Sequence, residues 1–168
     1  MRKTHHTAIA LAAMAMLFAT TAEARRGVVH VRGANGGATA AAGARGAAIR
    51  GHGTVQNADG SITHASGRAF AGANGSRGAR ASSTTVSPDG SVTRQGRLAA
   101  SGAKGSVASS GSVTRDADGT WSGGRSTSAT NNQTGTSYSG STTIDPATGK
   151  PVHSGTCTDA AGNVIPCR

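Results

Sequence analysis

The sequence predicts an all-β protein of repeated short β-hairpins, arranged as a meander or a solenoid. The first observation is a turn signal that recurs about every fifteen residues, at Gly60, Gly75, Gly90, Gly105, Gly119, Gly135 and Gly149. A fixed period of this kind indicates one supersecondary unit repeated along the chain. The second observation is composition, because no Glu and no Met follow residue 24. Those residues favour helices, whereas the Asp that remains favours turns.

The first 24 residues have the pattern of a secretory signal peptide. Arg2 and Lys3 make a basic start, residues 8–19 form an apolar run, and residues 22–24 (Ala-Glu-Ala) fit a signal peptidase site. A helix of 12 apolar residues covers about 18 Å, too little for the roughly 30 Å hydrocarbon core of a bilayer. We therefore expect a bacterial protein cleaved after Ala24, secreted or periplasmic, with no stable membrane span after cleavage.

Residues 25–53 differ in composition from the rest of the mature chain. They are rich in Arg, Gly and Ala, contain no acid, and offer little to pack beyond Val28, Val29, Val31 and Ile49. Low-complexity segments with so little apolar surface tend to stay disordered. We expect a flexible basic arm that contains at most a short strand at 28–32.

Residues 54–168 are expected to hold the hairpin repeat, about eight short strands in all. The strongest turns are four Asp-containing segments that end in glycine, at 57–60, 87–90, 116–119 and 145–149. Asp accepts hydrogen bonds from the turn backbone, and Gly takes the positive φ that tight turns need. An apolar pair brackets each turn and is expected to face across the hairpin: Val55 with Ile62, Val86 with Val92, Val113 with Trp121, and Ile144 with Val152.

The predicted core is thin. Residues 25–168 contain only 18 Val, Ile, Leu, Phe, Tyr and Trp residues, and burying all of them falls far short of the entropy lost in ordering the chain. Backbone ladders, a disulfide or self-association must therefore supply the remaining stability. Strand faces made of Gly, Ala, Ser and Thr suit flat stacked sheets and fibres, so self-association is expected.

The two cysteines, Cys157 and Cys167, are predicted to form a disulfide. An exported chain with an even number of cysteines favours this pairing, and the segment between them contains a turn that closes a hairpin. The alternative is a metal site, but two thiols by themselves make a poor zinc cage.

The turn between the cysteines carries a resemblance. Residues 159–164 (Asp-Ala-Ala-Gly-Asn-Val) resemble the D-x-x-G-N-hydrophobic turn of YD-repeat (Rhs-type) secreted proteins. The likeness covers six residues, and the Tyr-Asp pair of those repeats is absent. It implies repeated hairpins of an exported surface protein.

No motif commits the chain to a reaction, a cofactor or a metal. Hydroxyl side chains are abundant, but no Gly-x-Ser-x-Gly elbow lies between a strand and a helix. Residues 116–120 begin like a calcium loop, yet they lack its third acid and the closing Glu. We expect a protein that is not an enzyme and that binds no cofactor or metal.

Positive charge is the strongest indication of a ligand. After residue 24 there remain 15 basic and 6 acidic side chains, a net charge of +9. Such a charge attracts lipopolysaccharide, acidic polysaccharide or nucleic acid. The residues expected to bind the polyanion are those of the arm, Arg25, Arg26, Arg32, Arg45 and Arg50. The alternative is a basic site within the repeats, at Arg68, Arg77, Arg80, Arg94 and Arg97.

Two hypotheses of function follow from these observations. The first is an exported structural or adhesive β-repeat protein of the bacterial cell envelope or extracellular matrix, which self-assembles. The alternative is a basic secreted module that binds anionic polymers of the envelope. Salt separates the two, because phosphate-driven binding weakens steeply with salt and strand stacking does not.

Overall fold

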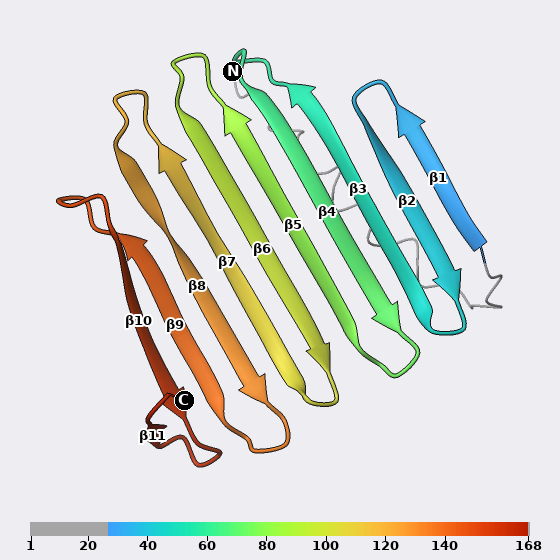
Figure 1. Ribbon diagram of the computed structural model, residues 1–168, viewed down its shortest axis with the longest axis vertical. Helices are drawn as coiled ribbons and strands as arrows, with labels where there is room; N and C mark the ends of the chain where they lie inside the picture. Colours follow the sequence, from blue (N-terminus) through green and yellow to red (C-terminus); the bar gives the residue numbers. More distant parts are fainter. Residues whose placement is uncertain (1–26, 168) are drawn as a thin grey trace, which may run out of the picture.

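A computed structural model describes residues 27–167, which form one open antiparallel sheet with every strand beside its neighbours in sequence (Figure 1). No helix occurs in these residues, so the all-β hairpin prediction is confirmed in its meander form. The eleven strands are β1 (Gly27–Gly33), β2 (Gly36–Gly43), β3 (Gly46–Gln56), β4 (Ile62–Gly72), β5 (Arg77–Val86), β6 (Val92–Gly102), β7 (Gly105–Arg115), β8 (Trp121–Asn131), β9 (Ser137–Ile144), β10 (Pro151–Thr158) and β11 (Val164–Ile165).

One turn motif closes four of the hairpins. In each, Asp or Asn precedes a glycine with positive φ, and the side-chain oxygen accepts the backbone N–H of the Ser or Thr after that glycine. The glycine N–H also donates to the carbonyl three residues earlier. This is the type I turn with a left-handed glycine that joins many hairpins. The four motifs are Asp59-Gly60-Ser61, Asn74-Gly75-Ser76, Asp89-Gly90-Ser91 and Asp118-Gly119-Thr120.

A second motif, Gly-Ala-x-Gly, closes three hairpins through two-residue turns at 34–35, 44–45 and 103–104. A glycine ends the first strand and another begins the second, so the chain reverses without side chains beside the turn. Two of these turns lie in the segment that the sequence predicted to be a flexible arm.

The expected arm is part of the sheet. Residues 27–33, 36–43 and 46–56 form β1, β2 and β3, which pair in continuous register with β4. Our expectation of disorder rested on the scarcity of apolar residues. That criterion fails here because the other strands of this sheet bury no apolar side chain either. Residues 25 and 26 and the expected signal peptide at 1–24 lie outside the described residues.

Turn hydrogen bonds, rather than apolar pairs, set the hairpin register. Each Asp-Gly-Ser/Thr turn is closed by a backbone bond across five residues, as from the N–H of Ser87 to the carbonyl of Ser91. Val86 and Val92 flank that turn and face each other as predicted. The other three expected pairs are wrong, because the flanking positions pair Ile62 with Gln56, Trp121 with Arg115, and Ile144 with Pro151.

The sheet is a single layer without an apolar core. Each strand contacts only the strands next to it in sequence, and no apolar side chain of residues 27–167 is buried. The buried residues within this range are two serines, Ser61 and Ser109, whose hydroxyls are hydrogen-bonded. Hydrogen bonds along the strands and in the turns therefore replace side-chain burial as the main source of order.

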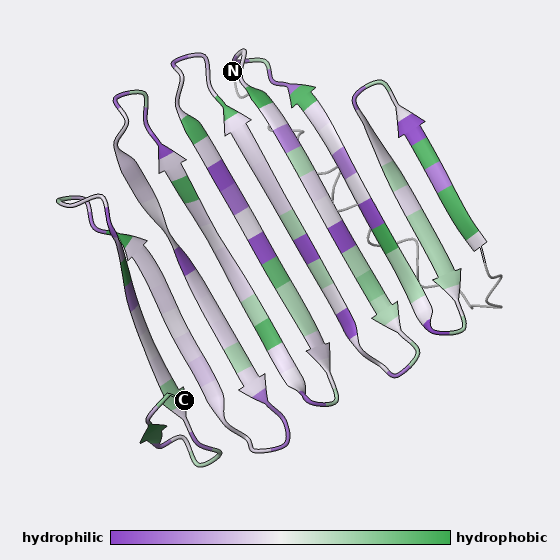
Figure 2. Ribbon diagram, in the orientation of Figure 1, coloured by the Kyte–Doolittle hydropathy of each residue, from purple (hydrophilic) through white to green (hydrophobic). Residues whose placement is uncertain are grey.

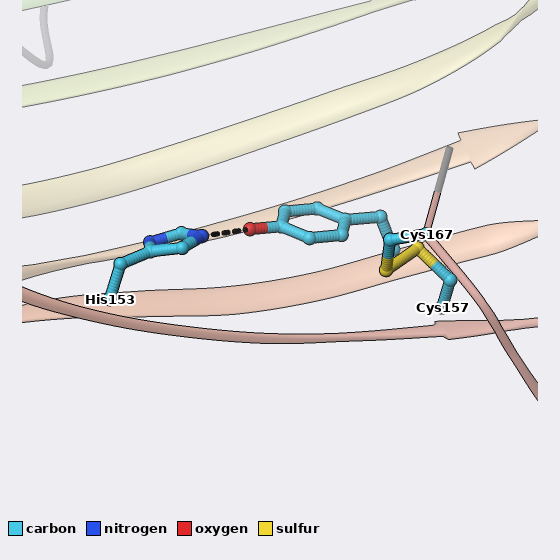
Figure 3. The surroundings of a disulfide bond; sticks show 4 residues. His153, Cys157 and Cys167 are labelled. Carbon is cyan, nitrogen blue, oxygen red and sulfur yellow. Dashed lines mark hydrogen bonds between the residues drawn. A yellow bond between two sulfur atoms is a disulfide. The ribbon is translucent and has the colours of Figure 1, made fainter.

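The predicted disulfide between Cys157 and Cys167 is confirmed (Figure 3). It ties the segment after β11 back to β10, with the two Cα atoms 5.3 Å apart. Tyr138 of β9 is the register partner of Cys157, and its hydroxyl lies 3.1 Å from Nε2 of His153. The bond thus closes the last hairpin, where β11 contributes only two residues to the ladder.

Replacing Gly90 by Ala measures the cost of the turn conformation alone. Gly90 has φ of +86°, and a β-carbon there would contact nothing within 4 Å. We expect the variant to lose about 1–2 kcal/mol of unfolding free energy, the cost of a left-handed L-residue. Gly43→Ala is the matched control, since it also meets nothing within 4 Å and has no positive φ. Equal denaturation midpoints for the two variants would contradict the assignment.

The Asp in three of the four turn motifs, Asp59, Asp89 and Asp118, should stabilise the fold in a pH-dependent way. Hydrogen bonds from the side chain and the N–H of Thr120 lower the pKa of Asp118 below its ordinary value of 3.8. A lowered pKa means that the stabilisation is complete above pH 3.8 and is lost as the pH falls through the folded-state value. Asp118→Ala should therefore lower the melting temperature at neutral pH, with a difference from wild type that shrinks in acid.

Asp116 provides the control within the same turn, because it contributes backbone groups that an alanine retains. Asp116→Ala should lower the melting temperature less than Asp118→Ala. Thermal unfolding of both variants between neutral and acidic pH provides the comparison. Equal decreases in melting temperature at neutral pH would contradict a stabilising role of the Asp118 side chain in the turn.

Candidate functional site

The two faces of the sheet carry different chemistry. Side chains alternate between faces along each strand, and the register then places one residue of every strand in each row across the sheet. We call the face that carries Arg50, Arg68 and Arg80 the arginine face, and the opposite one the small-residue face. Seven of the described arginines belong to the arginine face: Arg32, Arg50, Arg68, Arg80, Arg94, Arg115 and Arg125.

Three arginines stand side by side at the centre of that face. Arg50 of β3 pairs with Arg68 of β4, which in turn pairs with Arg80 of β5. All three side chains are exposed, and neighbouring strands place their Cα atoms about 5 Å apart. Figure 2 shows the corresponding hydrophilic bands next to one another across the middle of β3, β4 and β5. We call these three residues the arginine row.

No carboxylate offsets the charge of the arginine row. Every Asp of the described residues lies in a turn, and none lies in a strand. Arg68 and Arg80 are each six residues from the strand end that leads to the Asp59 or Asp89 turn, a separation of about 20 Å. Like charges directly opposite one another destabilise a sheet. The row therefore has a cost that an anionic ligand would relieve.

The charged turns divide between the two ends of the sheet. The turns with Asp59, Asp89, Asp116, Asp118 and Asp145 all lie at the end where β4 begins. The opposite end carries Arg45 and Lys104 in its turns, with Asp159 as its acid. The arginine row thus lies between an acidic end and a more basic end, and an anion is favoured on the basic side.

Hydrogen bonds hold several polar side chains of the arginine face in place. Nε of Arg125 donates to the hydroxyl of Ser109 at 2.7 Å, and that hydroxyl donates to the carbonyl of Ser126. His30 and His64 each lie within 3.0 Å of a threonine hydroxyl on the neighbouring strand. The face therefore combines free arginine side chains with a fixed polar surround.

A shallow apolar hollow adjoins the arginine row. It lies over β2 to β6, has a volume of about 580 Å³, and its lining includes Ala48, Phe70, Gly78 and Ala100. These four residues form one row across the strands, two residues from the arginine row on the same face. The Phe70 ring lies over Gly78, where a β-carbon would be only 2.6 Å from its Cε1 atom.

The small-residue face is nearly neutral. Its strand positions are mostly Gly, Ala, Ser and Thr, and its two arginines are Arg77 and Arg97. Hydroxyls on this face bond to one another across the strands, as between Thr63 and Thr85 at 2.8 Å. It therefore offers a flat surface with few charges.

The structure places the arm residues predicted to bind a polyanion in different locations. Arg32 and Arg50 lie on the arginine face, whereas Arg45 lies in the turn between β2 and β3. Arg25 and Arg26 lie outside the described residues. Of the alternative set in the repeats, Arg68, Arg80 and Arg94 join Arg32 and Arg50 on one face, and the other two lie on the opposite face.

Residues 27–167 contain no group of three or more His, Cys, Asp or Glu side chains placed to hold a metal ion. Within the same residues there is no helix that could cross a membrane. Comparison of the chain with protein-family models, curated proteins and solved structures finds no match.

Relieving the arginine row should stabilise the free protein. Arg68→Thr removes the central charge, so it should raise the unfolding free energy at low salt by about 0.5–1 kcal/mol more than Arg97→Thr. The control makes the same change of residue type at Arg97, which pairs with Ala81 and Ser110 instead of other arginines. At high salt the difference should vanish, because charges are then screened within a few ångströms. Chemical denaturation of both variants at low and at high salt measures these free energies. Equal unfolding free energies of the two variants at low salt would refute repulsion within the arginine row.

Proposed function

We propose that this protein is an exported adhesive β-sheet module that binds anionic polymers of the cell envelope through its arginine face. The observation that carries the proposal is the arginine row, three exposed guanidinium groups in register with no carboxylate in any strand. Arginine suits this role because its planar fork grips phosphate or carboxylate through paired hydrogen bonds.

The shape of the sheet supports a long ligand. A row across the strands is straight and repeats at about 5 Å, so it presents charges along a line instead of within a pocket. Arg32, Arg94 and Arg125 extend the positive surface on either side. A polymer with one negative charge per repeat can contact several of these groups at once, which raises its overall affinity.

Export is the second part of the proposal. The signal-peptide pattern at 1–24 supports cleavage after Ala24 and delivery to the periplasm or the extracellular space. The disulfide between Cys157 and Cys167 is compatible with either location, because oxidising compartments retain such bonds.

A structural role through self-assembly is the second candidate. It is favoured by the single layer, which leaves the small-residue face uncovered in an isolated molecule. In this role a second sheet would stack on that face, and the arginine face would remain turned outward.

Salt dependence tests the binding proposal. We expect the mature protein to bind a single-stranded oligonucleotide, used as a phosphodiester polymer of known counterion behaviour, with affinity that falls linearly on a log–log salt plot. Replacing Arg50, Arg68 and Arg80 together by Gln should reduce the slope by about 2, or 0.7 per lost phosphate contact. Fluorescence anisotropy over a salt series measures the slope.

The matched control is Arg77→Gln with Arg97→Gln, which removes two charges from the small-residue face. That variant should keep a slope close to the wild-type value. Equal slopes for the triple variant and the wild type would show that the arginine row does not bind the polymer.

A further inference from the structure

The arginine row and the apolar hollow lie together on the arginine face, and this juxtaposition selects among anionic ligands. The hollow is lined by apolar atoms over most of its surface, and the arginine row forms its polar border. A plain acidic polymer would use the border and leave the hollow in water. Only a ligand with an apolar part would contact both the arginine row and the hollow.

We propose that the arginine face binds a phosphorylated, acylated amphiphile, with the phosphate on the arginine row and an acyl chain along the hollow. This inference rests on the proposed function and names the class of its ligand. Lipopolysaccharide and glycerophospholipids both supply this chemistry. The ligand class differs from nucleic acid or polysaccharide by its hydrocarbon chain.

The dimensions of the hollow fit one acyl chain. It crosses five strands, β2 to β6, and four interstrand steps cover about 19 Å, which is long enough for one chain. One leaflet contributes about half of the 30 Å hydrocarbon core of a bilayer, or roughly 15 Å of extended chain. The volume of about 580 Å³ also falls within the usual range for small-ligand sites.

The spacing between the charged and apolar rows fits a phosphate ester. Phe70 follows Arg68 by two residues on the same strand, so the two rows are about 7 Å apart. An ester-linked chain can therefore reach the hollow while its phosphate accepts hydrogen bonds from Arg50, Arg68 or Arg80. The hollow also lies on the side of the row away from the turns with Asp59 and Asp89, which would repel the headgroup.

Phe70 supplies the one aromatic ring in the lining of the hollow. Its ring lies over Gly78, and its side chain remains 48 % exposed in the free protein. In the isolated sheet, this ring beside three cations leaves apolar surface exposed to water. A bound hydrocarbon chain would cover it and thereby gain the free energy of burying apolar surface.

Two pairs of ligands test the proposal by isothermal titration calorimetry: monoacylglycerol phosphate against glycerol phosphate, and lipid A against its deacylated form, all below their aggregation concentrations. We expect the acylated member of each pair to bind more tightly. Phe70→Ser should weaken acylated ligands about tenfold and leave deacylated ones unchanged. Val55→Ser is the control, an apolar residue of the small-residue face with 45 % exposure.

The outcomes separate this inference from the proposed function. Equal affinity for acylated and deacylated ligands, or an unchanged acyl preference in Phe70→Ser, would overturn the amphiphile and leave polymer binding intact. If none of the phosphate ligands binds, and the affinity for the oligonucleotide does not change with salt, both the amphiphile inference and the proposed function are overturned. Tighter binding of lipid A or of monoacylglycerol phosphate than of its deacylated form would support the inference. The pair with the larger difference would identify the source of the ligand.

A fluorescent variant gives an independent measurement that does not depend on truncating Phe70. Phe70→Trp in a Trp121→Phe background places the one tryptophan of the chain in the hollow. Its emission should shift to shorter wavelength with monoacylglycerol phosphate and stay unchanged with glycerol phosphate. An unchanged spectrum with the acylated ligand at saturation would contradict chain binding in the hollow.

Discussion

The backbone hydrogen-bond ladder between neighbouring strands is the interaction on which this structure depends. In most domains, the ladder is supported by apolar side chains buried between layers. Here no apolar side chain of residues 27–167 is buried, and the strands form a single layer. The ladder and the turns that align it must therefore hold nearly all of the order. Small residues are therefore sufficient in the strands, because there is no second layer against which large side chains must pack.

The turns supply the alignment that a core would otherwise give. An Asp or Asn before a left-handed glycine fixes where each strand ends, and the Ser or Thr that follows is bonded to the same side chain. A one-residue slip would move a strand's side chains to the opposite face. The separation of arginine from small residues is thus a consequence of accurate turns, although the two features are far apart in the sequence.

Much of the fold could be predicted from the sequence because turn chemistry is local. The spacing of Gly60, Gly75 and Gly90, together with the Asp-Gly turn chemistry, predicts hairpins. The even number of cysteines and the turn between them predict the disulfide. The register could not be predicted from apolar pairs such as Val55 and Ile62, because no core selects which residues face each other. The strands of residues 27–53 were missed for the same reason: their lack of apolar residues is ordinary in this sheet.

The candidate site illustrates a different limit. Arg50, Arg68 and Arg80 are 18 and 12 residues apart in the sequence, and no local pattern connects them. Only the complete register, with every turn length known, brings them into one row. The Gly-Ala-x-Gly turns and the Ser or Thr after each Asp-Gly were available signals that would have extended the register through β1 to β3.

A single-layer hydrogen-bond ladder carries this fold, and solution NMR of the dilute monomer can test that directly. Contacts between strands should follow the order of neighbours, such as Ile49 with Ala69 and Ala69 with Ala79. All other contacts should lie within a strand, within a turn, or between turns and strand ends at the same end of the sheet, as between Ala73 and Arg45. A sample that mixes labelled and unlabelled protein separates contacts between molecules from those within one. Intramolecular contacts between strands that are not neighbours in sequence, such as β3 with β8, would show a second layer and contradict the account.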